Sequence, residues 1–160
     1  THAEELSFIC PGAHGGVHGN KSDFGFSEDP WKSIFITEKM FEEGMVYPYM
    51  NGQLVFKTAV QKFPEVIMEA LEKAGKTPDQ LKLLIPHQAN LRISQFVQKR
   101  LRLRDDQVYS NIQKYGNTTA ASIPIALSEA CRDGLVERGD LICLAAFGSG
   151  FTWGSALINW

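Results

Sequence analysis

The sequence predicts an α/β fold in which helices are layered on a mixed β-sheet. Short apolar runs alternate along the chain with longer segments whose apolar residues recur every three or four positions. The first pattern is typical of buried strands and the second of helices, so their alternation favours a layered sheet. The predicted strands are residues 81–85, 108–112, 141–147 and 153–158, and the predicted helices are residues 52–75, 90–101 and 119–132.

The first predicted helix has one apolar face. Pro64 lies inside it and should kink or split it, because proline has no amide hydrogen and crowds the preceding turn. Gly75 is the expected stop, since glycine readily adopts the left-handed conformation that ends helices. The apolar face is formed by Val55, Phe56, Ala59, Val60, Phe63, Ile67, Ala70, Leu71 and Ala74.

The segment "TPDQ" predicts a capped helical turn before the first strand. Thr77 is the expected cap, Pro78 lies in the first turn, and the side chain of Gln80 is expected to reach back to Thr77. In the helix at 119–132, Pro124 predicts a local kink.

The helix at 90–101 is expected to bury one side and expose the other. Its inward side chains are predicted to be Leu91, Leu101 and either Phe96 or Val97. Arg92 lies seven and eight positions before Lys99 and Arg100, so these three basic residues share one helix face.

Composition limits the kinds of protein this chain could be. It has 160 residues, is 44% hydrophobic and has a formal charge of −2, which argues against a general nucleic-acid binder. No apolar run approaches the roughly 20 residues that cross a bilayer. Cys10, Cys131 and Cys143 lack metal-ligand spacing and predict reduced thiols in a cytoplasmic protein. His14 and His18 lie in a glycine-rich stretch, so no metal site is expected there.

Charge is unevenly distributed along the chain. Residues 1–51 hold three basic and eight acidic side chains, whereas residues 52–104 hold ten basic and four acidic side chains. The basic excess is consistent with a docking face for an anionic partner. An ordinary solvated surface is the alternative, and charge count alone favours it.

Polar groups stand where the predicted strands end. His87 follows the first strand in "LLIPHQANLRI", Asn117 follows the second, and the turn at 148–150 follows the third. In α/β sheets the ends of adjacent strands are where active sites form. A purely structural role, with His87 capping a helix and Asn117 supporting a turn, is the alternative for either residue alone.

Three blocks carry a resemblance to a known family. "IPHQANLRI", "KYGNTTAASIPIALSEA" and "AAFGSGFTWGSALI" closely resemble the C-terminal half of β-ketoacyl-acyl carrier protein synthase III, in the thiolase-like superfamily. With "GQLVFKTAV" before them they cover roughly residues 50–160, in family order. The resemblance implies a thiolase-like half-fold, with a C-terminal catalytic domain at 51–160 and a loop-rich leading segment at 1–50 that links from a missing N-terminal half.

The resemblance implies a decarboxylative condensing enzyme that starts fatty acid synthesis. Its substrates would be acyl-coenzyme A and malonyl carried on acyl carrier protein, bound as phosphopantetheine thioesters, with no tightly bound cofactor and no metal. Family members use Cys, His and Asn, and His87 and Asn117 match the last two. Loss of carbon dioxide places negative charge on a thioester oxygen, which two preorganised donors would stabilise.

The family's oxyanion loop matches "FGSG". Phe147 matches an aromatic residue near the reaction centre, although a plain core role is the alternative. Gly148, Ser149 and Gly150 match the loop whose backbone amide helps hold the thioester oxygen. Ser149 replaces a residue that is often glycine in the family.

The nucleophilic cysteine of the family lies in its N-terminal half, and none of the three cysteines here fits its place. None has an evident setting that would lower its thiol pKa. We therefore expect the isolated chain to be inactive and to need the missing half. Full-length relatives form homodimers, and an isolated half would expose apolar surface, so we expect it to self-associate through that surface.

The resemblance also assigns binding positions. Lys57, Arg92 and Lys99 match residues that dock the acidic carrier protein, and Arg100 lies beside them. The residues that match the path of the phosphopantetheine arm are Gly52, Phe56, Ala89 and Asn90, although Asn90 as a helix cap is the rival interpretation.

Two other functions remain open at this point. The chain could belong to another condensing enzyme of the superfamily, for example in polyketide-like or secondary metabolism, with other acyl groups. It could also be a non-catalytic module that docks carrier protein. A reading frame that continues upstream with a cysteine at a strand-to-helix turn would favour the enzyme.

Overall fold

The computed structural model describes residues 2–3, 42–43, 50–148 and 151–160. The chain divides into two compact units, one containing Phe56–Phe147 and Trp153–Trp160, the other Ala3–Val55 and Gly148–Thr152. The first unit holds nearly all of the sheet and the helices that cover it. Predictions for Cys10, His14, His18, Ser149 and Gly150 fall outside the described residues.

The described part of the chain forms a four-stranded sheet in the order β1-β4-β3-β2. The strands are β1 (His2–Ala3), β2 (Leu83–Pro86), β3 (Leu141–Gly148) and β4 (Thr152–Asn159). Strand β2 runs parallel to β3, with Leu83 opposite Ile142 and Pro86 opposite Ala145. All four residues of β2 are buried, as expected for a parallel strand covered on both faces.

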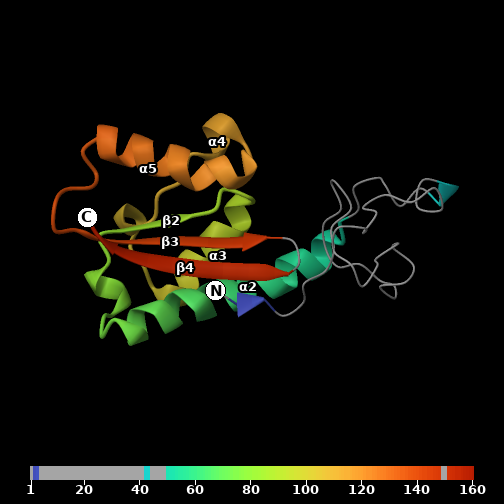
Figure 1. Cartoon of the computed structure of the whole chain (residues 1–160), viewed down its shortest axis with the longest axis horizontal. Coiled ribbons are helices and arrows are strands. Elements are labelled where there is room, and N and C mark those ends of the chain that lie inside the picture. Colours follow the sequence, from blue (N-terminus) through green and yellow to red (C-terminus); the bar gives the residue numbers. More distant parts are fainter. Residues whose placement is uncertain (1, 4–41, 44–49, 149–150) are drawn as a thin grey trace, which may run out of the picture. The chain divides into compact units, whose positions relative to one another are not determined.

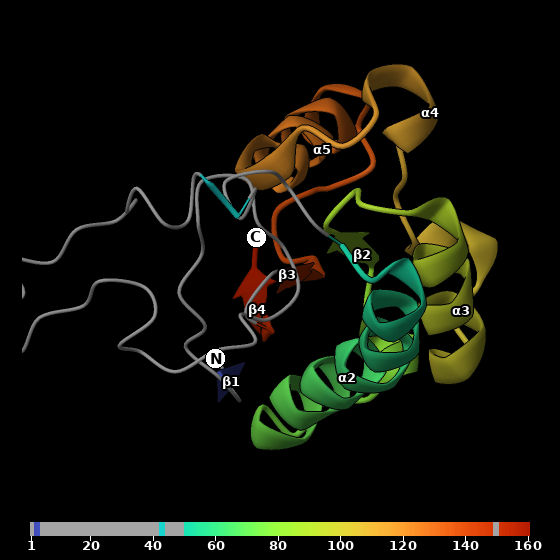
Figure 2. The same ribbon diagram turned by 90° about the vertical axis from the view of Figure 1, so that its right-hand side faces the viewer.

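Helices cover both faces of this sheet, as Figures 1 and 2 show. Helix α5 (Ser122–Arg132) lies on one face, and α2 (Gly52–Lys73) and α3 (Leu91–Leu101) lie on the other. Strand and helix side chains pack together beneath α5 in a buried cluster. Its members are Leu83, Ile85, Ala126, Ala130, Val136 and Ile142. The predicted α/β layering is confirmed, and no helix among the described residues is long and apolar enough to cross a membrane.

Helix α2 runs without interruption through Pro64, so the prediction that Pro64 splits it is wrong, while a kink at this residue stays a prediction. Pro64 is itself buried with Phe63 and Ile67, and burial of this face offsets the missing backbone hydrogen bond. The helix stops as predicted, because Gly75 adopts a left-handed φ of 63°. Phe56, predicted to face inward, is 37% exposed.

Helix α3 begins after Asn90, whose side chain accepts a hydrogen bond from the Arg92 backbone N–H at 2.9 Å. Its buried residues are Ser94, Val97 and Leu101, which are three and four positions apart. The predictions for Leu101 and for one of Phe96 and Val97 are confirmed, with Val97 as the buried one, whereas the prediction of an inward Leu91 is wrong, since both Leu91 and Phe96 are more than 40% exposed. Placing the small Ser94 on the inward face rotates the two larger apolar side chains outward.

The predicted strand at 108–112 is also wrong. Val108 makes only an isolated parallel bridge to Leu84, and the chain then enters the short helix α4 (Ile112–Tyr115). The backbone N–H of Asn111 donates to the Gln88 side chain at 3.1 Å instead of to a strand. A tertiary contact therefore ends the ladder that the apolar pattern predicted.

The remaining elements agree with the predictions or adjust them slightly. Thr77 donates its backbone N–H to Gln80 at 3.0 Å, in the single turn η3 (Pro78–Gln80). Pro124 lies in the first turn of α5, where a missing amide leaves no helical bond unmade, so no kink is required. Two further single turns are η4 (Asp105–Gln107) and η5 (Thr119–Ala121).

Candidate functional site

His87 is held at the carboxyl end of β2. Its backbone N–H donates to the Ala145 carbonyl at 2.8 Å, which continues the pairing of β2 with β3 by one residue. Its Nδ1 lies 2.5 Å from the Oγ of Ser122, the first residue of α5. The ring is half-buried, and desolvation lowers the pKa of His87 below its ordinary value of 6.5. The imidazole is therefore neutral at neutral pH, and its Nε2 is the ring nitrogen left for a substrate.

Gln88 locks the end of β2 to the segment that leads into α4. It is 1% exposed, and its side chain uses both donors and both acceptor positions. Nε2 donates to the carbonyls of Pro86 and Tyr109, and Oε1 accepts from the Ser110 hydroxyl and the Asn111 backbone N–H. Gln88 was not among the residues predicted from the sequence to have a role. The signal in the sequence that could have indicated such a role was the position of this long amide side chain, between a predicted buried strand and Asn90, the possible cap of the next helix.

Asn117 lies two residues after α4 rather than at the end of a strand, which corrects the predicted placement. Gly116, at φ 68°, makes the turn that brings the chain out of α4. The Oδ1 of Asn117 accepts the Thr119 backbone N–H at 2.8 Å. Because the acceptor end of the amide is engaged, its NH2 end is the one available to donate to a ligand.

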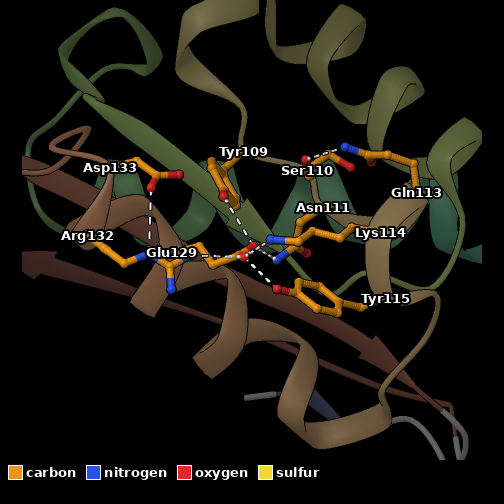
Figure 3. A network of polar contacts seen from close by, with 9 residues as sticks. All are labelled: Tyr109, Ser110, Asn111, Gln113, Lys114, Tyr115, Glu129, Arg132 and Asp133. Carbon is orange, nitrogen blue, oxygen red and sulfur yellow. Dashed lines mark hydrogen bonds and ion pairs between the residues drawn. The ribbon is translucent and has the colours of Figure 1, made fainter.

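The helix that precedes Asn117 is anchored by Glu129 of α5. Figure 3 shows side chains from the 109–115 segment converging on this carboxylate. Asn111 Nδ2 lies 2.8 Å from Oε2, while Tyr115 Oη and Lys114 Nζ lie 2.6 and 2.5 Å from Oε1. Arg132 adds a longer contact of 3.2 Å from α5 itself.

The Glu129 carboxylate remains ionised although it is buried. Hydrogen bonds from Lys114, then Tyr115, then Asn111 lower the pKa of Glu129 to about 2. The same contact raises the pKa of Lys114. Glu129 was not predicted from the sequence to have a role, although an acidic residue on the same helix face as Ala126 and Ala130 was a signal for one.

Phe147 is 8% exposed and stacks on Trp153 of β4, with ring centroids 6.2 Å apart and an interplanar angle of 13°. This packing accounts for its burial. Gly148 is the last residue of β3, and the rest of the loop at 148–150 lies outside the described residues. A contribution of this loop to an oxyanion site stays a prediction.

The cysteines of the described region are unpaired. Cys143 is buried in β3, and desolvation raises its thiol pKa to about 12, so it is not a thiolate at neutral pH. Cys131 is partly buried on α5. In the ranges that the structure describes, no three His, Cys, Asp or Glu side chains are grouped so that they could hold a metal ion.

The four predicted docking cations are all exposed: Lys57 on α2, and Arg92, Lys99 and Arg100 on α3. The two helices lie on the same side of the sheet. The positions predicted to line a phosphopantetheine path are also exposed at the surface. They are Gly52, Phe56, Ala89 and Asn90, of which Asn90 also caps α3.

These features define the class of protein. A neutral imidazole stands at the carboxyl end of a parallel strand in an α/β sheet, where such proteins form their active sites. Residues 71–160 match the model of the family described as 3-oxoacyl-[acyl-carrier-protein (ACP)] synthase III C terminal, and the chain belongs to this family.

Named relatives agree with the family match. The β-ketoacyl-[acyl-carrier-protein] synthase III of Caldanaerobacter subterraneus subsp. tengcongensis is 42% identical over 98% of this chain and 47% of its own length. That of Aquifex aeolicus is 46% identical over 84% of this chain and 46% of its own length. The chain thus spans about half the length of these relatives, and the first of these alignments extends beyond residues 50–160.

Solved structures show the same fold. The 3-oxoacyl-[acyl-carrier-protein] synthase III of Aquifex aeolicus VF5 superposes with a TM-score of 0.71 at 50% identity, covering 74% of this chain and 38% of that chain. The corresponding synthase of Pseudomonas aeruginosa PAO1 has a TM-score of 0.71 at 38% identity, covering 78% of this chain and 39% of that chain. The predicted thiolase-like half-fold is confirmed.

Proposed function

We propose that this chain is the decarboxylating half of a β-ketoacyl-acyl carrier protein synthase III that starts fatty acid synthesis. The observation that carries the proposal is the neutral, partly desolvated His87, held through Nδ1 at the end of β2 with Nε2 left for a substrate. Family membership supplies the reaction class, and the relatives carry that enzyme's name.

In the proposed reaction, His87 and Asn117 act as two hydrogen-bond donors. Malonyl thioester loses carbon dioxide, and the electron pair of the broken C–C bond moves into the thioester carbonyl. The imidazole N–H and the amide NH2 stabilise the resulting enolate oxygen more than the neutral carbonyl of the ground state. The carbanion then attacks the carbonyl of an acyl thioester held on a cysteine supplied by the remainder of the enzyme. The new C–C bond forms, the C–S bond breaks, and the cysteine leaves as a thiolate.

The basic surface on α2 and α3 would dock the acyl carrier protein. Lys57, Arg92, Lys99 and Arg100 are exposed and available to an acidic partner. Each such rim contact contributes about 1 kcal/mol or less and is weakened by salt. Coenzyme A and phosphopantetheine thioesters enter as substrates past Gly52, Phe56, Ala89 and Asn90, and the Gly148–Gly150 loop supplies a backbone donor beside Phe147. Homodimerisation and a cytoplasmic location belong to the same proposal.

The test is a reconstitution assay. This chain is mixed with the separately expressed upstream half of its parent, and carbon dioxide release and β-ketoacyl product are followed from malonyl-acyl carrier protein and acyl-coenzyme A. We expect activity only when both halves are present. His87→Ala and Asn117→Ala should each lower kcat on the order of 10²–10³-fold, the effect of losing one oxyanion donor.

Asn159→Ala is the matched control, because Asn159 is an exposed asparagine at the end of β4 outside the proposed site. It should leave kcat unchanged. If the paired halves assemble and turn over but His87→Ala and Asn117→Ala keep the wild-type rate, the donors are structural and the mechanism is wrong. Carrier-protein binding without turnover by the assembled halves would favour the docking module instead.

A further inference from the structure

Ser122 is the buried polar group that contacts His87 directly. It is 2% exposed, and its Oγ has two partners, the His87 Nδ1 at 2.5 Å and the Gln88 backbone N–H at 3.3 Å. A serine hydroxyl has one hydrogen to donate and two lone pairs that accept. The question for the chemistry is which atom of the His87–Ser122 pair carries the shared hydrogen.

The contact with the Gln88 backbone N–H decides the direction of the hydrogen bond between Ser122 and His87. A backbone N–H can only donate, so it occupies a lone pair of Ser122 Oγ and leaves the hydroxyl hydrogen to find an acceptor. Within the described ranges, Ser122 Oγ has no third partner. A buried hydroxyl without an acceptor is costly, on the order of 1–3 kcal/mol. The acceptor within reach is Nδ1 of His87.

We infer that Ser122 donates its hydroxyl hydrogen to Nδ1 of His87 and thereby holds the ring in the Nε2–H tautomer. Ser122 is thus a positioning residue, which acts through His87 and does not touch the substrate. The inference rests on the proposed function for its consequence but not for its test. Desolvation lowers the pKa of His87 and keeps the ring neutral, so one ring nitrogen is a lone-pair acceptor for this bond.

The consequence concerns the developing negative charge. With the proton on Nε2, the exposed edge of the ring is a donor that stabilises an enolate oxygen. With the proton on Nδ1, the same edge presents a lone pair that repels it. One buried hydroxyl on α5 therefore selects the tautomer of His87 that can donate to the enolate over the tautomer that would repel it.

The test reads the tautomer itself. The protein is labelled with 15N-histidine, and long-range 1H–15N correlation spectra are recorded well above pH 6.5. The His87 signals, one set among four histidines, are assigned by their loss in His87→Gln. We expect a protonated-type Nε2 and a bare, hydrogen-bonded Nδ1 in the wild type. A protonated Nδ1 in the wild-type protein would overturn the inference, whether or not the Ser122 variants fold.

Variants then separate positioning from packing. Ser122→Ala should yield a mixture of tautomers, and kcat in the complete enzyme should fall with little change in KM. Ser122→Thr retains a hydroxyl and should restore the Nε2–H form. Ser155→Ala is the control, because Ser155 lies on β4, which is not adjacent to β2, and its hydroxyl donates to the Val66 carbonyl of α2. A folded Ser122→Ala protein with a pure Nε2–H ring would contradict the assignment, whereas a correct tautomer in an inactive parent would contradict only the proposed function.

Discussion

The two ends of α5 favour opposite charge states in the ionisable groups beside them, a neutral His87 at one end and a charged Glu129 at the other. At its first residue, Ser122 contacts the His87 imidazole, whose pKa is lowered by desolvation. Two turns later, Glu129 is 5% exposed, more buried than His87, but it is surrounded by Lys114, Tyr115 and Asn111, and its pKa falls to about 2. The imidazole is therefore neutral, and the carboxylate is charged.

The difference shows what each end is suited to do. Desolvation without a charged partner leaves a neutral ring whose remaining nitrogen can interact with a substrate. A carboxylate that accepts several charged or polar donors is bound to them and has little capacity for chemistry. Since Glu129 holds the α4 segment and Ser122 holds His87, one helix positions both proposed donors by different physical means.

The largest expected effect is on catalysis, at the proposed donor Asn117. Asn117→Asp should reduce condensation by at least as much as Asn117→Ala, on the order of 10²–10³-fold in kcat, because a carboxylate repels the enolate oxygen. Stability should change little, since Asn117 is exposed and only its Oδ1 has a partner in the described region. Steady-state assays of the reconstituted enzyme, combined with urea unfolding, check both statements. An Asp variant as active as the wild type would remove Asn117 from the mechanism.

The next effect tests the link between the two regions. Gln88→Met keeps the approximate volume but leaves buried groups, including the Asn111 N–H, without partners. Each unsatisfied buried group costs about 1–3 kcal/mol of unfolding free energy. Gln113→Met is the control, because Gln113 is exposed and makes one weak contact to Ser110, so about 0.5 kcal/mol or less is expected. Equal urea midpoints for the two variants would show that Gln88 does not couple β2 to α4.

The contribution of Glu129 to the free energy of unfolding should depend on pH. Glu129→Gln should be less stable than the wild type at neutral pH, because the lowered pKa means that the native state favours the ionised carboxylate. The difference is fully present above the ordinary pKa of 4.5 and should vanish as pH falls through about 2. Thermal unfolding from pH 7 to pH 2 measures it.

Glu65→Gln provides the comparison for that series. Glu65 is an exposed partner of Lys62 at 3.3 Å, and a surface pair of this kind contributes little. Its variant should follow the wild-type pH profile closely. A Glu129→Gln deficit that persists unchanged in acid would mean that packing, not charge, explains the role of Glu129.

The smallest effect is expected at the surface. Arg92→Glu should raise KM for acyl carrier protein about fivefold or less, leave kcat unchanged, and lose its effect as salt increases. Lys76→Glu makes the same charge change at an exposed position just beyond the far end of α2 and should have no effect. Equal responses of the two variants would indicate a general charge effect rather than docking.

Much of the architecture could be predicted from local patterns. The strands at 141–147 and 153–158 were placed within one residue of β3 and β4, and Gly75 was identified as a helix stop. These are features whose cause lies in a few neighbouring residues, such as apolar alternation or a left-handed φ. The predicted strand at 108–112 does not continue beyond its single bridge to β2, because the Asn111 backbone N–H donates to the side chain of Gln88, more than twenty positions away.

The candidate site divides in the same way. The sequence by itself determined that His87 follows a buried strand and that Asn117 follows a flexible Gly116, because both are written in adjacent residues. Only the tertiary structure decided that Ser122 engages Nδ1, that Gln88 joins β2 to α4, and that Glu129 is buried yet ionised. Those outcomes depend on hydrogen bonds and burial between residues that are far apart in the sequence. A local sequence pattern does not show which distant segments will be packed together.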